Sequence, residues 1–192
     1  MAKRYDQMLA LIEKVKPIRI VEIGVHHGIR AHRLCRKALE LSTSVRYTGY
    51  DVFDTMTAEF QEAALNGKGM PSETEARSRL DQLKPDLKYE LVIGDTRDTL
   101  HRKSVEADFC FIDGDHRVDA VRGDYLALAS SNCIVFDDYY RADKRGAMPD
   151  LTKYGANQVI EELSAKGMRV EILPHGDTCK HGGVSYLAVV WN

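Results

Sequence analysis

Acidic residues stand at or just after the ends of five short apolar runs in this sequence. The runs and their acidic residues are Ile18–Val21 before Glu22, Val45–Tyr50 before Asp51, Tyr89–Gly94 before Asp95, Phe109–Ile112 before Asp113, and Cys133–Phe136 before Asp137 and Asp138. In an open parallel α/β sheet the carboxyl ends of the strands face one edge, and ligands bind there. Carboxylates from five strands at one edge therefore predict a site for a nucleoside-like cofactor, with a metal ion or a base beside it.

Strand and helix patterns alternate along the chain of 192 residues, which is long enough for one domain, residues 1–192. The predicted strands are Ile18–Ile23, Arg46–Tyr50, Glu90–Ile93, Phe109–Ile112, Cys133–Phe136, Arg169–Leu173 and Val184–Trp191, and the predicted helices are Tyr5–Val15, Ile29–Leu41, Val118–Ala129 and Ala156–Lys166. This order predicts the α/β class, with a Rossmann-like doubly wound sheet of about seven strands and helices on both faces. The short link Pro174–Gly183 predicts that the last strand is antiparallel, because a parallel crossover needs a dozen or more residues.

Residues 53–86 form an insertion after the second strand. Its pattern predicts two helices, Ala58–Leu65 and Ser72–Gln82, separated by a turn that contains Gly67, Gly69 and Pro71. The insertion leaves the sheet at the ligand edge, so it could be a lid over the site. It could equally be a helical crossover with a surface loop.

Composition narrows the classes of partner and compartment. The net charge of −2 gives no electrostatic reason to expect nucleic acid or an anionic membrane as a partner. The segment Met1–Asp6 lacks the apolar core of a signal peptide, and the sequence has no apolar run long enough to span a bilayer. The four cysteines form no C-x-x-C pair, which favours a reduced, cytoplasmic protein.

The segment from Glu22 to Gly28 joins the first strand to the following helix. Gly24 permits a tight turn there, and Gly28 permits close approach of the backbone to a ligand. His26 and Ile29 occupy the second and third glycine positions of the dinucleotide pattern G-x-G-x-x-G. A cofactor without phosphates fits this segment better than a dinucleotide, so a dehydrogenase is the weakest interpretation.

Two further strand ends carry candidates for nucleoside recognition. Asp51 suits a carboxylate that accepts hydrogen bonds from two ribose hydroxyls, although it could instead cap the insertion. Asp95 and Thr96, after the third strand, could bond an adenine amino group. A plain helix N-cap is the stronger interpretation of Asp95.

The fourth and fifth strands deliver Asp113, Asp137 and Asp138 to neighbouring positions. Three carboxylates without adjacent lysines would repel one another unless a cation bound among them, and such hard oxygen ligands favour Mg²⁺, with Ca²⁺ or Mn²⁺ as alternatives. One or two of these aspartates could instead cap turns. Asp115 and His116 follow in the same loop and could act as a general base, or His116 could orient a carboxylate.

The motifs Phe111-Ile-Asp-Gly-Asp-His116 and Ile134-Val-Phe-Asp-Asp-Tyr139 resemble those of small S-adenosylmethionine-dependent methyltransferases of the class I fold. Within that fold they are most similar to the methyltransferase domain 24 group, which is related to the macrocin and rhamnosyl O-methyltransferases. The resemblance extends from Ile18 to Trp191, with the motifs in the expected order. It implies S-adenosyl-L-methionine as cofactor. The residues implied to bind it are Glu22, Gly24, Val25, His26, Gly28, Asp51, Val52, Gly94, Asp95, Thr96 and Asp113. It also implies Asp113, Asp137 and Asp138 as metal ligands, and Asp115 or His116 as the base.

The implied reaction transfers the sulfonium methyl group to an oxygen of a small hydroxylated molecule. A metal ion would lower the pKa of the attacking hydroxyl, and Asp115 or His116 would accept its proton. One alternative is a metal-dependent glycosyltransferase, since Asp113-Gly-Asp115 has the D-x-D pattern. Another is a non-catalytic, methyltransferase-like binding module. The sequence is also compatible with a homodimer.

The loop Pro174–Gly183 lies between the last two strands. It could line the substrate site or be a plain surface turn. His175, Cys179 and His181 resemble a metal cluster, but their spacing matches no familiar zinc site.

Overall fold

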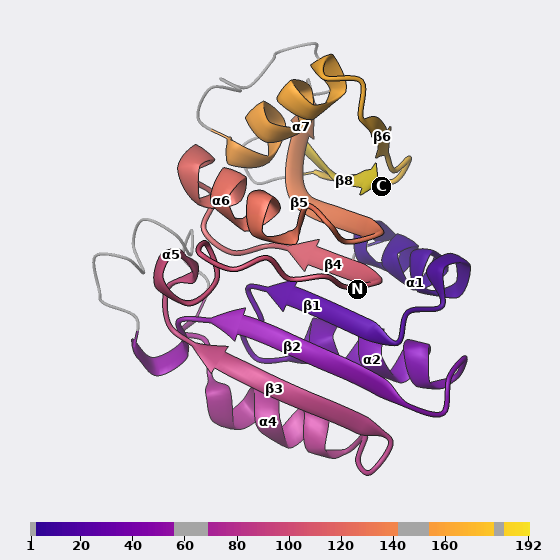
Figure 1. Cartoon of the computed structure of the whole chain (residues 1–192). Coiled ribbons are helices and arrows are strands. Elements are labelled where there is room, and N and C mark those ends of the chain that lie inside the picture. Colours follow the sequence, from indigo (N-terminus) through magenta and orange to yellow (C-terminus); the bar gives the residue numbers. More distant parts are fainter. Residues whose placement is uncertain (1–2, 56–68, 142–153, 179–182) are drawn as a thin grey trace.

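The computed structural model describes residues 3–55, 69–141, 154–178 and 183–192 (Figure 1). Its centre is an eight-stranded sheet in the order β3-β2-β1-β4-β5-β8-β6, with the short β7 paired to β8. The strands are β1 (Arg19–Ile23), β2 (Val45–Asp51), β3 (Leu87–Ile93), β4 (Phe109–Ile112), β5 (Cys133–Arg141), β6 (Arg169–Ile172), β7 (Asp177–Thr178) and β8 (Val184–Trp191). The helices are α1 (Lys3–Val15), α2 (Ile29–Leu39), α4 (Glu73–Asp81), α5 (Thr96–Thr99), α6 (Val118–Leu128) and α7 (Gly155–Ala165), with a 3-10 turn η1 (Phe53–Thr55).

The pairing of the strands confirms the predicted fold class. Strands β1 to β5 pair in parallel, whereas β8 runs antiparallel to β5 and β6. Two features differ from the sequence interpretation. Strand β5 continues past Phe136 to Arg141, and β7 lies inside the link that was expected to be only a loop. Both extensions pair with β8, so long-range pairing decides them rather than local pattern.

Helices cover both faces of the sheet (Figure 1). On one face α1, α2 and α4 pack on a core that includes Ile20, Tyr47 and Phe111. On the other face α6 and α7 pack on a second core that includes Val21 and Ile112. Because both faces of the central strands are buried, these strands are apolar almost throughout, which is the pattern that made them recognisable. In the described part of the chain, no helix has both the length and the apolarity needed to cross a membrane.

The described part of the insertion packs against the hydrophobic core. Helix α4 begins after Ser72, whose hydroxyl accepts a hydrogen bond from the backbone N–H of Glu75 at 3.3 Å. Ala76 and Leu80 of this helix are buried against α2 and the sheet. The second predicted helix of the insertion is therefore present. The first, Ala58–Leu65, lies outside the described residues, so a lid there stays a prediction.

The strand order reverses direction between β1 and β4, because the chain proceeds from β1 outward to β2 and β3 and then returns to the other side of β1. Such a topological switch point opens a crevice at the carboxyl ends of the strands. Backbone hydrogen bonds hold these ends in line: Gly24 N–H donates to the Tyr50 carbonyl at 2.9 Å, and Asp113 N–H to the Ile23 carbonyl at 2.8 Å. The carboxyl ends of these strands therefore lie together at one edge of the sheet, which is the edge where the sequence predicts a ligand.

Candidate active site

The turn after β1 is built around Gly24. Its φ is +87°, and a Cβ atom at this position would lie 1.9 Å from the backbone oxygen of Asp113. No other residue fits this close approach of two backbones, so Gly24 fixes the distance between the β1 turn and the β4 turn. Gly28 has a φ of +73°, and its Cβ would lie 2.7 Å from Cα of Ala76. Helix α4 thus lies close to the backbone at Gly28, and the predicted approach of a ligand there stays a prediction.

Asp51, at the end of β2, organises the turn from the opposite side. Its carboxylate accepts hydrogen bonds from the backbone N–H groups of His26 at 2.7 Å and Phe53 at 2.9 Å. Burial raises the pKa of Asp51, and these N–H donors act against that rise. Each carboxylate oxygen has a second lone pair, so hydroxyl donors can still be accommodated. Asp51 lies at the rim with Val52, as the ribose hypothesis requires, whereas the Val25 side chain is part of the core.

Glu22 lies below the rim. Its side chain is 0% exposed and accepts a hydrogen bond from the hydroxyl of Tyr47 at 2.6 Å, while Oε1 is buried without a hydrogen-bond partner. Burial raises the pKa of Glu22 to about 7, more than the nearby Arg30 charge and the Tyr47 hydrogen bond lower it. Among the predicted cofactor residues, Glu22 is therefore a buried group that lies beneath the β1 turn and contacts Tyr47.

Asp95 and Asp115 are both paired with an arginine two residues later. Asp95 caps α5 through a hydrogen bond from the Arg97 backbone N–H at 2.9 Å, and its carboxylate also pairs with the Arg97 guanidinium. Asp115 accepts the Arg117 backbone N–H at 2.9 Å and pairs with that guanidinium too. Asp95 is thus the N-cap of α5, which is the stronger of the two interpretations of this residue from the sequence. Thr96 lies beside it in the first turn of α5, and Gly94 precedes it with a φ of +130°.

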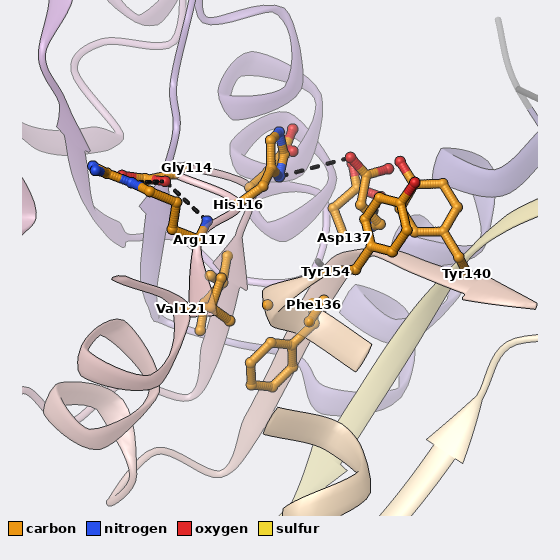
Figure 2. A pocket seen from close by; sticks show the side chains of 14 residues that line it. Gly114, His116, Arg117, Val121, Phe136, Asp137, Tyr140 and Tyr154 are labelled. Atoms are coloured by element: carbon orange, nitrogen blue, oxygen red, sulfur yellow. Dashed lines mark hydrogen bonds and ion pairs between the residues drawn. The ribbon is translucent and has the colours of Figure 1, made fainter. Parts of the chain in front are cut away.

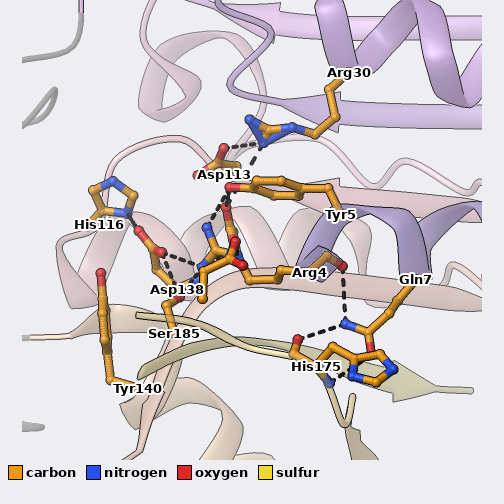
Figure 3. A network of polar contacts seen from close by, with 12 residues as sticks. Arg4, Tyr5, Gln7, Arg30, Asp113, His116, Asp138, Tyr140, His175 and Ser185 are labelled. Atoms are coloured by element: carbon orange, nitrogen blue, oxygen red, sulfur yellow. Dashed lines mark hydrogen bonds and ion pairs between the residues drawn. The ribbon is translucent and has the colours of Figure 1, made fainter. Parts of the chain in front are cut away.

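A β-bulge in β5 places Asp137 and Asp138. The register against β8 shifts between Phe136 and Tyr139, and Asp138 adopts a φ of +54°. Adjacent residues of a regular strand point to opposite faces, and the extra residue of a bulge breaks that alternation. Both carboxylates therefore reach the polar network of Figure 3 instead of opposite faces of the sheet.

Two arginines lie among the three aspartates, which corrects the expectation that only a bound cation could balance them. Arg4 of α1 contacts Asp137 at 3.2 Å and Asp138 at 3.1 Å, and Arg30 of α2 pairs with Asp113 (Figure 3). The hydroxyl of Tyr5 donates to Asp137 at 2.6 Å. Helix α1 is thereby fastened to the end of β5, and neither arginine was assigned to the acidic cluster from the sequence.

These contacts divide the charges of the cluster unequally. Burial raises the pKa of Asp137 to about 7, and the charges of Asp113 and Asp138 contribute to that rise. Burial also acts on Asp138, but the charges of His116 and Arg4 and a hydrogen bond from Ser185 outweigh it, so its pKa is lowered. Asp138 is therefore the better anion of the adjacent pair.

The predicted metal triad is only partly assembled. Ligand atoms of Asp113, His116 and Asp138 lie within 4.8 Å of one another, and His116 Nδ1 is 3.8 Å from Asp138 Oδ2. Asp137 is not in this group, because its side chain is 2% exposed and is occupied by Arg4 and Tyr5. The structure thus brings His116 to the place where Asp137 was expected. The proximity of His116 to Asp113 in the sequence was the available signal.

A pocket opens beside this cluster between the starts of α6 and α7 (Figure 2). Asp113, Asp115, His116, Asp138 and Arg117 provide its polar wall. Its other lining residues include Val121, Phe136, Tyr140 and Tyr154. The rings of Tyr140 and Tyr154 lie 4.3 Å apart, and Asn157 holds the Tyr140 backbone with two hydrogen bonds of 2.9 Å. The pocket therefore combines a charged wall with an aromatic one.

The loop Pro174–Gly183 is described up to Thr178 and again at Gly183. The backbone of His175 exchanges hydrogen bonds with the side chain of Gln7 at 2.8 and 3.0 Å, which holds α1 in place. Cys179 and His181 lie outside the described residues, so neither the zinc hypothesis nor a substrate-lining role is tested there.

Comparison with known proteins identifies the class. A family model described as a methyltransferase domain matches residues 21–139, more than half of the chain. The chain belongs to this methyltransferase family, in agreement with the group that its motifs resemble. No curated protein sequence matches the chain.

Solved structures share the fold at low sequence identity. An O-methyltransferase from Bacillus cereus in complex with SAH is 18% identical, with a TM-score of 0.65, and the match covers 100% of this chain and 82% of that one. The O-methyltransferase TomG from Streptomyces achromogenes, in complex with SAM, is 18% identical, with a TM-score of 0.63 and coverage of 100% and 81%. SAH-bound PaMTH1 from Podospora anserina is 18% identical, with a TM-score of 0.54 and coverage of 100% and 80%.

Proposed function

We propose that this protein transfers a methyl group from S-adenosyl-L-methionine (SAM) to a hydroxyl oxygen of a small molecule. The observation that carries the proposal is the arrangement at the switch point, where the Gly24 turn lies between Asp51 and Asp113 in a chain of the methyltransferase family. Similar folds bind SAH in the Bacillus cereus O-methyltransferase and SAM in TomG, which supports the same cofactor here.

In this proposal Asp51 accepts the ribose hydroxyls, and the first turn of α2 lies beside the tail of the cofactor. The pocket lined by Tyr140 and Tyr154 receives the acceptor, with its hydroxyl directed toward His116 and Asp138. The chain contributes to the rate mainly by aligning the acceptor oxygen with the methyl group, because the cofactor already carries the reactive bond.

We further propose a divalent cation at Asp113, His116 and Asp138. The donor set fits, since three potential ligand atoms lie within 4.8 Å of one another on the wall of the pocket. The set combines carboxylates, which suit Mg²⁺ and Mn²⁺, with an imidazole, which suits softer transition metals, so Mn²⁺ is a better probe than Mg²⁺ alone. A bound ion would supply Lewis acidity that lowers the pKa of the acceptor hydroxyl.

Of the two residues proposed as base, His116 is the better placed. Asp115 has its carboxylate engaged by the backbone and guanidinium of Arg117. His116 lines the pocket and could either bind the ion or accept the proton. The two roles have different signatures, because loss of a ligand weakens Mn²⁺ binding, whereas loss of a base changes the pH profile of turnover.

The further expectations concern partners and location. We propose a small-molecule acceptor without nucleic acid or membrane as partner, and a homodimer as the assembly to test first. Free, buried Cys35, Cys110 and Cys133 suit a reducing compartment such as the cytoplasm.

The test is transfer of a radiolabelled methyl group from SAM to a panel of catechols, monophenols and sugars, with Asp51→Asn as the variant and exposed Asp98→Asn as its matched control. The proposal predicts labelled product with the native protein and the control, and at least a tenfold loss with Asp51→Asn. Glycosyl transfer from UDP-sugars without any methyl transfer would favour the glycosyltransferase instead. Binding of SAM without turnover on any acceptor would favour a binding module.

A further inference from the structure

Arg30 is held rigidly at the edge of the proposed cofactor site. It occupies the second position of α2 and pairs through Nη1 with Asp113 Oδ2, and Nη1 is also 4.0 Å from Asp137 Oδ2. Its guanidinium lies 4.4 Å from the centre of the Tyr5 ring and 4.9 Å from that of Phe111. Packing between two rings and an ion pair with a buried carboxylate leave this side chain little freedom.

This ion pair is incomplete on both sides. The Asp113 side chain is 4% exposed, and its Oδ1 atom is buried without a hydrogen-bond partner. Among the described residues, Arg30 makes a hydrogen bond only through Nη1, so Nε and Nη2 retain their donors. Buried polar groups without partners are costly, and each one in a native structure calls for an explanation. Here a free acceptor and free donors lie side by side.

A ligand group that satisfies both must offer a cation to Asp113 and a planar anion to Arg30. An α-amino acid group has both charges on adjacent positions, and a carboxylate matches the fork of a guanidinium. The start of α2 adds backbone N–H groups that favour an anion at the same end. Because Arg30 and Asp113 already neutralise each other, a zwitterion enters without changing the net charge of the site.

We propose that Arg30 and Asp113 together bind the amino acid tail of the cofactor, with Arg30 on the α-carboxylate and Asp113 on the α-ammonium. This inference rests on the proposed function, and it adds Arg30 as a residue that decides which nucleosides bind. The position agrees with the topology: Asp51 ends β2 and Asp113 ends β4, on either side of the β1 turn. A nucleoside held at Asp51 therefore directs its 5′ substituent across Gly24 toward Arg30. Asp113 has four lone-pair positions on its two oxygens, so this role leaves room for the proposed cation.

The test compares three ligands by calorimetry: S-adenosylhomocysteine (SAH), its decarboxylated analogue, and 5′-methylthioadenosine, which lacks the tail. On the native protein, we expect both truncated ligands to bind at least tenfold more weakly than SAH. With Arg30→Gln, we expect SAH affinity to fall at least tenfold and that of the decarboxylated analogue to stay within threefold. Arg33→Gln on the same helix, where Arg33 pairs with exposed Asp6 at 2.9 Å, is the matched control and should change none of them.

The outcomes separate the inference from the proposed function. Equal affinity of the native protein for SAH and its decarboxylated analogue would overturn the role of Arg30 while leaving the cofactor assignment intact, and this comparison needs no variant to fold. An equal loss of all three ligands in Arg30→Gln would also overturn it. If the native protein bound neither SAH nor 5′-methylthioadenosine, the proposed cofactor itself would be wrong, and the inference would fall with it.

Discussion

Glu22 should make the protein less stable as the pH rises through neutrality. Its side chain is fully buried, one of its oxygens has no hydrogen-bond partner, and burial raises its pKa from 4.5 to about 7. Between these two values the folded state holds a proton that the unfolded chain has released. Stability therefore falls as the pH rises in this window, and the full cost of ionised Glu22 is reached above pH 7.

The magnitude follows from the two pKa values. Each pKa unit corresponds to 1.36 kcal/mol, so a rise from 4.5 to about 7 makes ionised Glu22 cost on the order of 3 kcal/mol. Glu22→Gln keeps the size of the side chain and removes the charge. Its free energy of unfolding, relative to the native protein, should increase by about 2 kcal/mol between pH 5 and pH 8.5.

The assay is urea unfolding at a series of pH values, followed by circular dichroism. Asp137, whose pKa is also raised to about 7, titrates in both proteins and largely cancels in the difference. Glu90→Gln, on the exposed side of β3, is the matched control, and the difference for Glu22→Gln should change with pH by clearly more than the difference for this control. A flat difference for Glu22→Gln, or one that decreases with pH, would refute the reasoning.

Three further predictions concern the rim and its charges. Gly24→Ala places a Cβ 1.9 Å from the backbone oxygen of Asp113 at a φ of +87°. We therefore expect the free energy of unfolding in urea to fall by at least ~3 kcal/mol and SAH binding to be undetectable by calorimetry. Near-native values of both would show that the turns after β1 and β4 can separate freely. Arg4→Met leaves Asp137 and Asp138 without their shared cation and should lower the free energy of unfolding by ~3 kcal/mol at pH 8 but by less at pH 5.5, where Asp137 is protonated; an equal loss at both pH values would contradict this. Treatment with EDTA should lower methyl transfer at least tenfold and added Mn²⁺ should restore it, whereas undiminished turnover would remove the basis for the metal at Asp113, His116 and Asp138.

The fold could be predicted from the sequence because its signals are local. Apolar runs such as Phe109–Ile112 identify buried strands, and alternation with helices predicts their parallel arrangement. The length of the last link was enough to predict the reversed strand β8. The acidic residues reach one edge for the same reason, since that edge is fixed once the strands are parallel.

The balance of charge in the site could not be predicted, because it depends on partners far apart in the chain. Arg4 lies 134 positions from Asp138, and Arg30 lies 83 positions from Asp113. The bulge that brings Asp137 and Asp138 to one side depends on the register with β8, which two adjacent aspartates do not reveal. The pairs of Asp95 with Arg97 and of Asp115 with Arg117 were more accessible, because in both cases the arginine follows two residues after the acid.

The most direct test of the account is calorimetric titration of SAH into the native protein and into Asp51→Asn. Asp51 accepts one backbone hydrogen bond from the turn after β1, at His26, and one from the turn after β2, at Phe53, and the account assigns the ribose to its remaining lone pairs. We predict clear binding by the native protein and at least a tenfold weaker affinity in the variant, with both proteins folded by circular dichroism. Absence of SAH binding by the native protein would contradict the assignment of this edge to a methyl donor.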